Sequence, residues 1–194
     1  MTDRRNASEN AQIDRMTDRP RIPWHQRWLA SGEFNVVLFS FLLHFVWEFL
    51  QVPLFADMPT MEHWEAVVFC ARAALGDVLI ALFAFWVVAL IRADRRWIVA
   101  PGKAAILGFI AVGVAITVAL EWHATAILDR WQYGDLMPTV PILGTGVSPL
   151  VQWVLLPPLA VWIVRRQILG QESLGCESPE PDQSRARSRR STSI

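Results

Sequence analysis

Four long apolar segments limit what this chain of 194 residues can fold into. They lie at residues 34–55, 66–91, 104–126 and 147–164, with polar or charged sequence before the first and after the last. Each approaches or exceeds the roughly 20 residues with which an α-helix crosses a ~30 Å hydrocarbon core. None shows the polar stripe by which a helix of a soluble bundle faces water. The sequence therefore predicts an all-α integral membrane protein with four transmembrane helices.

Lysine and arginine residues in the connections give these helices an expected direction. The basic residues are concentrated in three stretches, 1–33, 92–103 and 165–194. The connections 56–65 and 127–146 hold acidic residues and a single basic one, Arg130. Because cytoplasmic loops carry the excess of Lys and Arg, we expect an antiparallel bundle with both termini cytoplasmic. Tryptophans near the expected boundaries, with Trp97 on the cytoplasmic side, are typical of an aromatic belt.

Composition divides the chain into three parts. They are a polar cytoplasmic N-terminal segment at 1–33, the transmembrane domain at 34–166, and a disordered cytoplasmic tail at 167–194. The tail is rich in Ser, Pro, Glu and Arg, which is typical of disorder. In the first part, residues 21–29 are either a short interfacial helix or part of a disordered segment. Cys70 and Cys176 form no CxxC pair, which excludes a disulfide scaffold and a structural zinc site.

Polar side chains inside the spans are the main functional clue, because an ionisable group in a bilayer is costly and usually has a partner or a role. His44, Glu48 and Gln51 are spaced i, i+4, i+7 and share one face of the first helix. The other spans contribute five more: Arg72, Asp77, Glu121, His123 and Gln152. Given the helix directions, nearly all of the eight lie between the midplane and the periplasmic surface, with His44 near the middle. The sequence predicts a polar pocket toward that face, under a 127–146 connection that is either a lid or a rigid connector.

Two interpretations of these eight residues stay open. In one they form a functional pocket that binds, or helps to move, a metal ion or a small polar solute. A divalent metal ion is then a candidate cofactor, and five side chains have suitable ligand atoms: His44, Glu48, Asp77, Glu121 and His123. In the other they only satisfy one another and fix helix packing, for example through Arg72 and Glu48 or Glu121, as in a structural or assembly subunit.

A membrane-embedded enzyme that uses the same carboxylates and histidines for acid–base chemistry is a further alternative. No HExxH motif is present and no catalytic residue can be assigned, so a binding role is favoured over an enzyme. The expected partner is the lipid bilayer, and no nucleic acid is expected. The inner halves of the spans are apolar, so a path onward to the cytoplasm would need a homo-oligomer or a membrane partner subunit.

Three stretches of the sequence resemble those of an uncharacterised family of small four-span bacterial inner-membrane proteins with no known activity. They are Val46-Trp-Glu-Phe-Leu-Gln-Val-Pro-Leu54, Gly76-Asp-Val-Leu-Ile80 and the region from Arg130 to Trp153. The resemblance covers residues 34–166 and implies four spans in a bacterial inner (plasma) membrane. In that family a His-Cys pair often precedes the Gly-Asp, and Arg72 stands where that histidine would be. A role that needs the histidine is therefore not implied for this chain.

Overall fold

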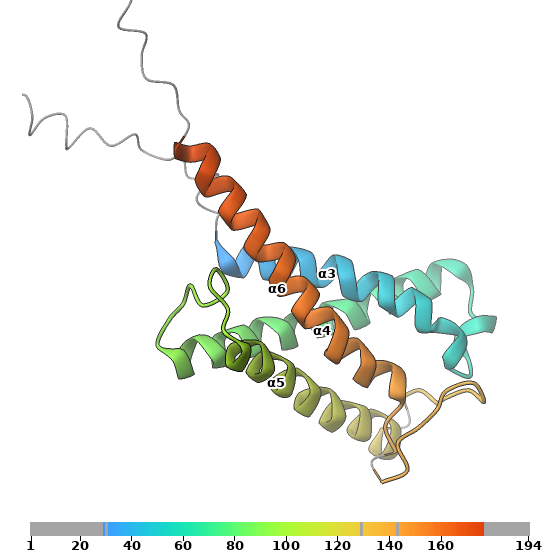
Figure 1. Ribbon diagram of the computed structural model, residues 1–194. Helices are drawn as coiled ribbons and strands as arrows, with labels where there is room; N and C mark the ends of the chain where they lie inside the picture. The colour runs from blue at the N-terminus through green and yellow to red at the C-terminus, as the bar shows by residue number, and fades with distance from the viewer. Residues whose placement is uncertain (1–28, 30, 129, 143, 177–194) are drawn as a thin grey trace, which may run out of the picture.

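The computed structural model describes residues 29, 31–128, 130–142 and 144–176. Four long helices dominate the fold in Figure 1: α3 (Gly32–Gln51), α4 (His63–Arg92), α5 (Lys103–Trp122) and α6 (Val147–Cys176). Two 3₁₀ turns, η1 (Val52–Leu54) and η2 (Met58–Thr60), connect α3 to α4, and a π-helical turn, η3 (His123–Ile127), continues α5. The helix α3 packs against α4 and α6, and α5 packs against the same two helices.

Each of the four is long and apolar enough to cross a membrane, over Gly32–Leu54, His63–Arg92, Lys103–Ile127 and Val147–Ser173. The expected helical class and the number of long apolar helices are thereby confirmed. Many large apolar side chains are exposed on the outside of the bundle, including Leu50, Leu79 and Leu90. Exposed apolar surface of this extent is typical of a protein that contacts lipid or another apolar surface.

The fourth helix is longer than its apolar segment and corrects one expected boundary. It continues to Cys176, so residues 167–176, which we assigned to the disordered tail, are helical. The physical reason is tertiary: Ile168 is 2% exposed in the core, Arg96 bonds to Glu172, and Arg165 Nε donates to Val99 O over 2.9 Å. Residues 21–28 and 177–194, where an interfacial helix and the rest of the tail are expected, lie outside the described residues.

Side chains cap the first two long helices. The Ser31 hydroxyl accepts from Phe34 N over 3.2 Å, and the Glu62 carboxylate accepts from the backbone N–H groups of Trp64 and Glu65. Both satisfy N–H groups that a helix start leaves without a partner. Helix α4 ends at Ala93, which adopts the left-handed conformation with φ 50°. The helix bounds thus follow from local chemistry as well as from hydropathy.

One end of the bundle, here called the Trp97 end, consists of the 93–102 connection, the first turn of α3 and the last turns of α6. Arg95 Nε lies 2.6 Å from Glu33 Oε1, which ties the connection to α3. Trp97 is 0% exposed, packs on the rings of Phe85 and Phe109, and donates to Phe85 O over 3.2 Å. The expected place of Trp97 in an aromatic belt is therefore wrong, because the connection folds back and buries the indole in the core.

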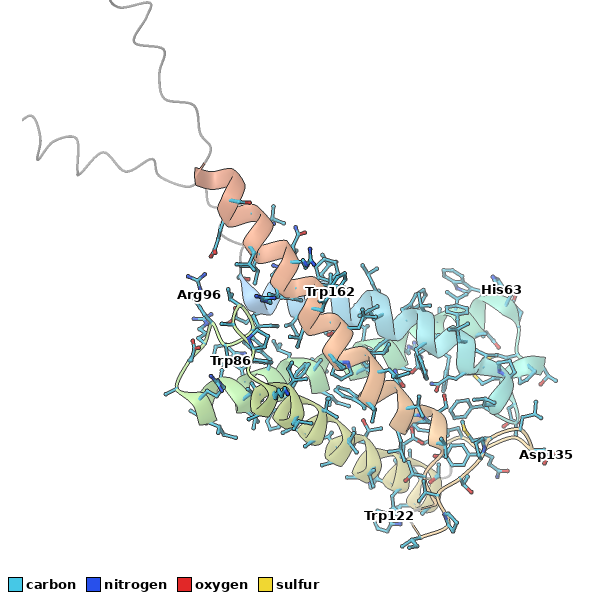
Figure 2. All side chains as sticks on the ribbon, viewed as in Figure 1. His63, Trp86, Arg96, Trp122, Asp135 and Trp162 are labelled. Atoms are coloured by element: carbon cyan, nitrogen blue, oxygen red, sulfur yellow. The ribbon has the colours of Figure 1, made fainter. Side chains whose placement is uncertain are left out.

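The opposite end, here called the loop end, holds the connections 52–62 and 128–146. Backbone hydrogen bonds join the two, from Ala56 N to Gln132 O over 3.0 Å and from Gly134 N to Leu54 O over 2.8 Å. In Figure 2 the labelled Arg96 and Asp135 lie at these two opposite ends of the molecule. In Figure 1, α4 and α5 lie together near the Trp97 end and diverge toward the loop end.

Candidate functional site

A cavity of about 410 Å³ lies at the loop end, with walls from all four long helices and from the start of the 128–146 connection. Seven of the eight residues expected in the pocket line it: Glu48, Gln51, Arg72, Asp77, Glu121, His123 and Gln152. The eighth, His44, is 2% exposed and lies behind the wall, in contact with Asp77. The volume is in the range of ordinary small-molecule sites.

Gln152 lies at the centre of the polar contacts below the cavity. Its Nε2 atom is 3.0 Å from Asp77 Oδ2, 3.3 Å from Glu48 Oε1 and 2.7 Å from His44 Nδ1. His44 Nδ1 is in turn 3.1 Å from Asp77 Oδ2. An amide nitrogen carries only two protons, whereas three acceptor atoms converge on it. The amide can therefore donate to two of these atoms, and in the Nδ1–H tautomer the His44 ring would donate to Asp77.

Gln51 is held by Ser148 of α6, which was not among the expected pocket residues. The Ser148 hydroxyl donates to Gln51 Oε1 over 2.9 Å and accepts from Trp47 Nε1 over 3.3 Å. Ser148 precedes Gln152 by four residues, so both lie on one face of α6. That spacing is the signal that could have identified Ser148. These bonds fix α3 against the first turn of α6 and so fix one wall of the cavity.

Glu121 accepts a hydrogen bond from the Tyr133 hydroxyl, which pins the 128–146 connection to the end of α5. Burial raises the pKa of Tyr133, and the hydrogen bond to Glu121 raises it further, so the phenol stays a proton donor. The chain leaves regular α-helix at His123, where the π-helical turn begins, and both Glu121 and His123 line the cavity. Tyr133 was not among the expected pocket residues, because its position depends on the path of the connection.

The charges at the cavity differ in how they are partnered. The three carboxylates are hydrogen-bonded by protein groups: Glu48 and Asp77 by Gln152, and Glu121 by Tyr133. Arg72 lines the cavity, yet within the described residues it forms no ion pair. The pairing of Arg72 with Glu48 or Glu121 that a packing network would use is therefore not formed.

Two further donors line the same cavity. The Arg130 guanidinium lies 6.0 Å from the centre of the Trp131 ring, and both residues belong to the wall. Thr117 is 7% exposed, and among the described residues its hydroxyl has no hydrogen-bond partner. A buried hydroxyl without a partner is uncommon in native proteins and calls for an explanation such as a ligand or an ordered water. Trp131 Nε1, in the same wall, is likewise buried without a partner among the described residues, so the unpaired donors at the cavity include Arg72, the Thr117 hydroxyl and this indole N–H.

The geometry does not support the expected metal set. Over the described residues, no group of three or more His, Cys, Asp or Glu side chains is placed to hold one metal ion. Asp77 and Glu48 converge on the Gln152 amide, whereas Glu121 is turned to Tyr133. The five candidate ligands are therefore not gathered around one point.

The cavity ends where the apolar core begins. Trp153 is 0% exposed and packs so closely on α5 that a Cβ at Gly113 would lie 1.9 Å from its ring. Gly113 is one turn from Thr117, which lines the cavity. Beyond it, toward the Trp97 end, the interior is filled by a continuous apolar cluster that includes Phe85 and Phe109. The polar site thus occupies one half of the bundle only.

No family model, curated protein or solved structure matches this chain. The side chains that meet at the cavity are therefore the basis for its function.

Proposed function

We propose that this chain is a multi-pass membrane protein that binds a small solute with charged or polar groups in the loop-end cavity. Its four long helices would be antiparallel spans of a bacterial inner membrane, with both termini in the cytoplasm. The observation that carries the binding function is the convergence of seven polar side chains from four helices on one cavity of about 410 Å³. Such side chains are expensive inside a bilayer unless they serve a ligand or one another.

The charge of the two ends supports this orientation. Arg95 and Arg96 lie at the Trp97 end, together with other basic residues of the 92–103 and 165–166 stretches. The loop end carries the acidic connections, in which Arg130 is the single basic residue. By the positive-inside rule the Trp97 end is cytoplasmic and the cavity is near the periplasmic surface.

A binding role fits the site better than a packing network or a conduction path. A packing network leaves no cavity and pairs its charges, whereas here a void remains and Arg72 has no carboxylate partner among the described residues. A conduction path would continue through the bundle, whereas Trp153 and the apolar core close the cavity at mid-depth. Acid–base chemistry would have to use His123, which lines the cavity, because His44 lies behind Asp77 and Gln152.

Filling the cavity tests the binding function. A Cβ at Gly76 meets no atom within 4 Å and Gly76 lines the cavity, so Gly76→Phe places a large side chain at the site. Leu75→Phe is the matched control, because Leu75 is on another face of the same helix, is 54% exposed and does not line the cavity. We expect organic extracts of detergent-purified wild type and L75F to contain a compound near one equivalent that G76F lacks. If mass spectrometry finds no such compound, the cavity does not bind a solute.

Cysteine labelling tests the orientation separately. In a chain with Cys70→Ala and Cys176→Ser, we expect Leu136→Cys to react with a membrane-impermeant maleimide in bacteria whose outer membrane alone is permeabilised. Leu136 is 71% exposed in the 128–146 connection. Asp94→Cys, in the 93–102 connection, should react only after the inner membrane is opened. The reverse pattern would place the cavity on the cytoplasmic side.

A further inference from the structure

We infer that the solute is an anionic amphiphile, whose acidic headgroup binds at Arg72 and whose apolar chain leaves the cavity sideways between α4 and α5. This inference rests on the proposed binding function and names the chemical class of its ligand. It is carried by three features of the cavity: its unpaired cation, its open apolar side and the depth at which the cation lies.

The sign of the headgroup follows from which charges are already satisfied. The carboxylates of Glu48 and Asp77 accept hydrogen bonds from Gln152, and Glu121 accepts from Tyr133. A cationic ligand would have to share these carboxylates with protein donors that already bind them. Arg72 faces the same space without an ion pair in the described part of the chain, and its five N–H donors suit a phosphate or a carboxylate.

The buried Thr117 hydroxyl is an independent sign that a polar ligand group enters the site. It is 7% exposed, lines the cavity and has no hydrogen-bond partner among the described residues. Asp77 is five residues further along α4 than Arg72, about 7.5 Å at 1.5 Å per residue. Along the axis of α4, Arg72 therefore lies nearer the loop end than Asp77, and a hydroxyl or ester oxygen of a headgroup bound at Arg72 can reach deeper, toward Thr117.

The apolar chain follows from the exposed side of the cavity. Phe69, Arg72 and Gly76 are spaced i, i+3, i+7 on one face of α4, and all three both line the cavity and are exposed. The same face continues toward the Trp97 end with Leu79, 68% exposed, and Phe83, 57% exposed. On the α5 side, Leu120 lines the cavity and is 53% exposed. The cavity is therefore continuous with an apolar surface on which an acyl or prenyl chain can lie.

The depth of Arg72 suits a lipid headgroup. Helix α4 has 30 residues and is about 45 Å long, which exceeds a ~30 Å hydrocarbon core by about 7 Å at each end. Arg72 is about 14 Å from the start of the helix, so its Cα lies some 6 Å inside the hydrocarbon boundary. From there a guanidinium reaches the headgroup layer, as long basic side chains near helix ends do. The phosphate of a lipid headgroup is within reach of Arg72 at this depth, whereas an anion without an apolar chain would have to enter the cavity from water.

Thermal unfolding of the full chain in dodecyl maltoside, with defined additives, tests this inference. We expect dioleoyl phosphatidylglycerol to raise the unfolding temperature saturably, and equal amounts of dioleoyl phosphatidylcholine or of free glycerol phosphate to leave it unchanged. An equal effect of phosphatidylcholine would show that net negative charge is not recognised. An equal effect of glycerol phosphate would show that the ligand needs no chain. Either result overturns the inference.

Variants locate the effect. Arg72→Gln should weaken the apparent affinity for phosphatidylglycerol at least about tenfold, since it removes a charge-assisted contact. Arg92→Gln is the matched control, because it removes one positive charge at the other end of α4, outside the cavity. G76F should abolish binding and L75F should not. If R72Q weakens binding while G76F has no effect, the lipid is bound at the bundle surface and the inference is wrong.

The two proposals fail separately. A compound that copurifies with wild type and not with G76F, together with no response to phosphatidylglycerol, would uphold the binding function and overturn the anionic amphiphile. If no copurifying compound depends on Gly76, the binding function itself fails. Should R72Q not fold, Arg72→Lys serves instead: it keeps the charge but loses the planar donor pair, and its affinity should be lower than that of wild type. Equal affinity of R72K and wild type would show that Arg72 acts only as a point charge.

Discussion

Gly113 of α5 leaves no room for a side chain, and Gly113→Ala tests whether Trp153 closes the cavity as described. A Cβ added at this position would lie 1.9, 2.2 and 2.8 Å from three atoms of the Trp153 ring. Ordinary carbon contacts are about 3.5–4.0 Å, so the ring or the helix must move by more than about 1 Å. Trp153 is 0% exposed and a rigid ring, which leaves it little freedom to yield.

Gly108→Ala on the same helix is the matched control. A Cβ there would lie 3.6 Å from Val88 Cγ2, which is an ordinary contact. Both substitutions gain about 1 kcal/mol of helix propensity, because alanine restricts the unfolded chain more than glycine does. Overpacking a well-packed core costs about 1–3 kcal/mol, and the upper end applies to a contact this short with a rigid ring. We expect G108A to be up to about 1 kcal/mol more stable than wild type and G113A to be about 2 kcal/mol less stable.

Thermal unfolding of both variants in the same detergent measures the difference. About 3 kcal/mol between them corresponds to a separation of unfolding temperatures of roughly 10 °C for a domain of this size. The centre of the His44 ring is 5.2 Å from that of the Trp153 ring, so G113A should also disturb the contacts of His44 with Asp77 and Gln152. A second substitution, Trp153→Phe, should recover part of the loss in G113A, as a double-mutant cycle would show. Equal unfolding temperatures for G113A and G108A would refute the packing argument.

Three further outcomes are expected. Tyr133 is the single tyrosine of the chain, so an alkaline titration of tyrosinate absorbance reports this residue alone. The midpoint of the titration should exceed the ordinary tyrosine pKa of about 10 and should be lower in Glu121→Gln than in wild type. An ordinary midpoint in wild type would contradict the buried contact with Glu121. Because the pKa is raised in the folded state, the stability from this group is full below pH ~10 and is lost as the pH rises from there toward the folded pKa. Gln152→Leu should lower the free energy of unfolding by about 3 kcal/mol, because the buried acceptors Asp77 and Glu48 lose their donor. A loss below about 1 kcal/mol in denaturant titration would show that the amide is dispensable. Arg95→Ala should change the free energy of unfolding by less than about 1 kcal/mol, because the Arg95 side chain is 68% exposed in its pair with Glu33, and a larger change in the same titration would show that the pair acts in a network.

Much of the helical framework can be predicted from the sequence because it follows from local properties. Apolar length predicts the four helices, and helical spacing places His44, Glu48 and Gln51 on one face of α3. Glu48 and Gln51, together with polar residues at matching depth on the other helices, line one cavity because helices that pack side by side bring equal depths together. Depth along a span is thus the coordinate that sequence conveys best.

Features that depend on helix rotation and on the path of the connections could not be predicted in this way. Whether Arg72 meets a carboxylate depends on how α4 is turned about its axis, which hydropathy does not determine. Tyr133 reaches Glu121 only because the 128–146 connection runs back along the end of α3. Trp97 is buried because the 93–102 connection folds inward, and the same connection extends α6 through the contact between Arg96 and Glu172.

The bonds at the loop end also determine which helix can move. Gln51 and Ser148 join α3 to α6, while Glu121 and Tyr133 join α5 to the connection that is hydrogen-bonded to Leu54. These bonds hold α3, α5 and α6 together at this end. The loop-end half of α4 meets these helices through Asp77, through the rings of Phe69 and Trp131, whose centres are 6.4 Å apart, and through Cys70 and Ala74, which are both 0% exposed. Any movement of this half away from the other helices would therefore break the hydrogen bond between Asp77 and Gln152 and expose these two buried side chains.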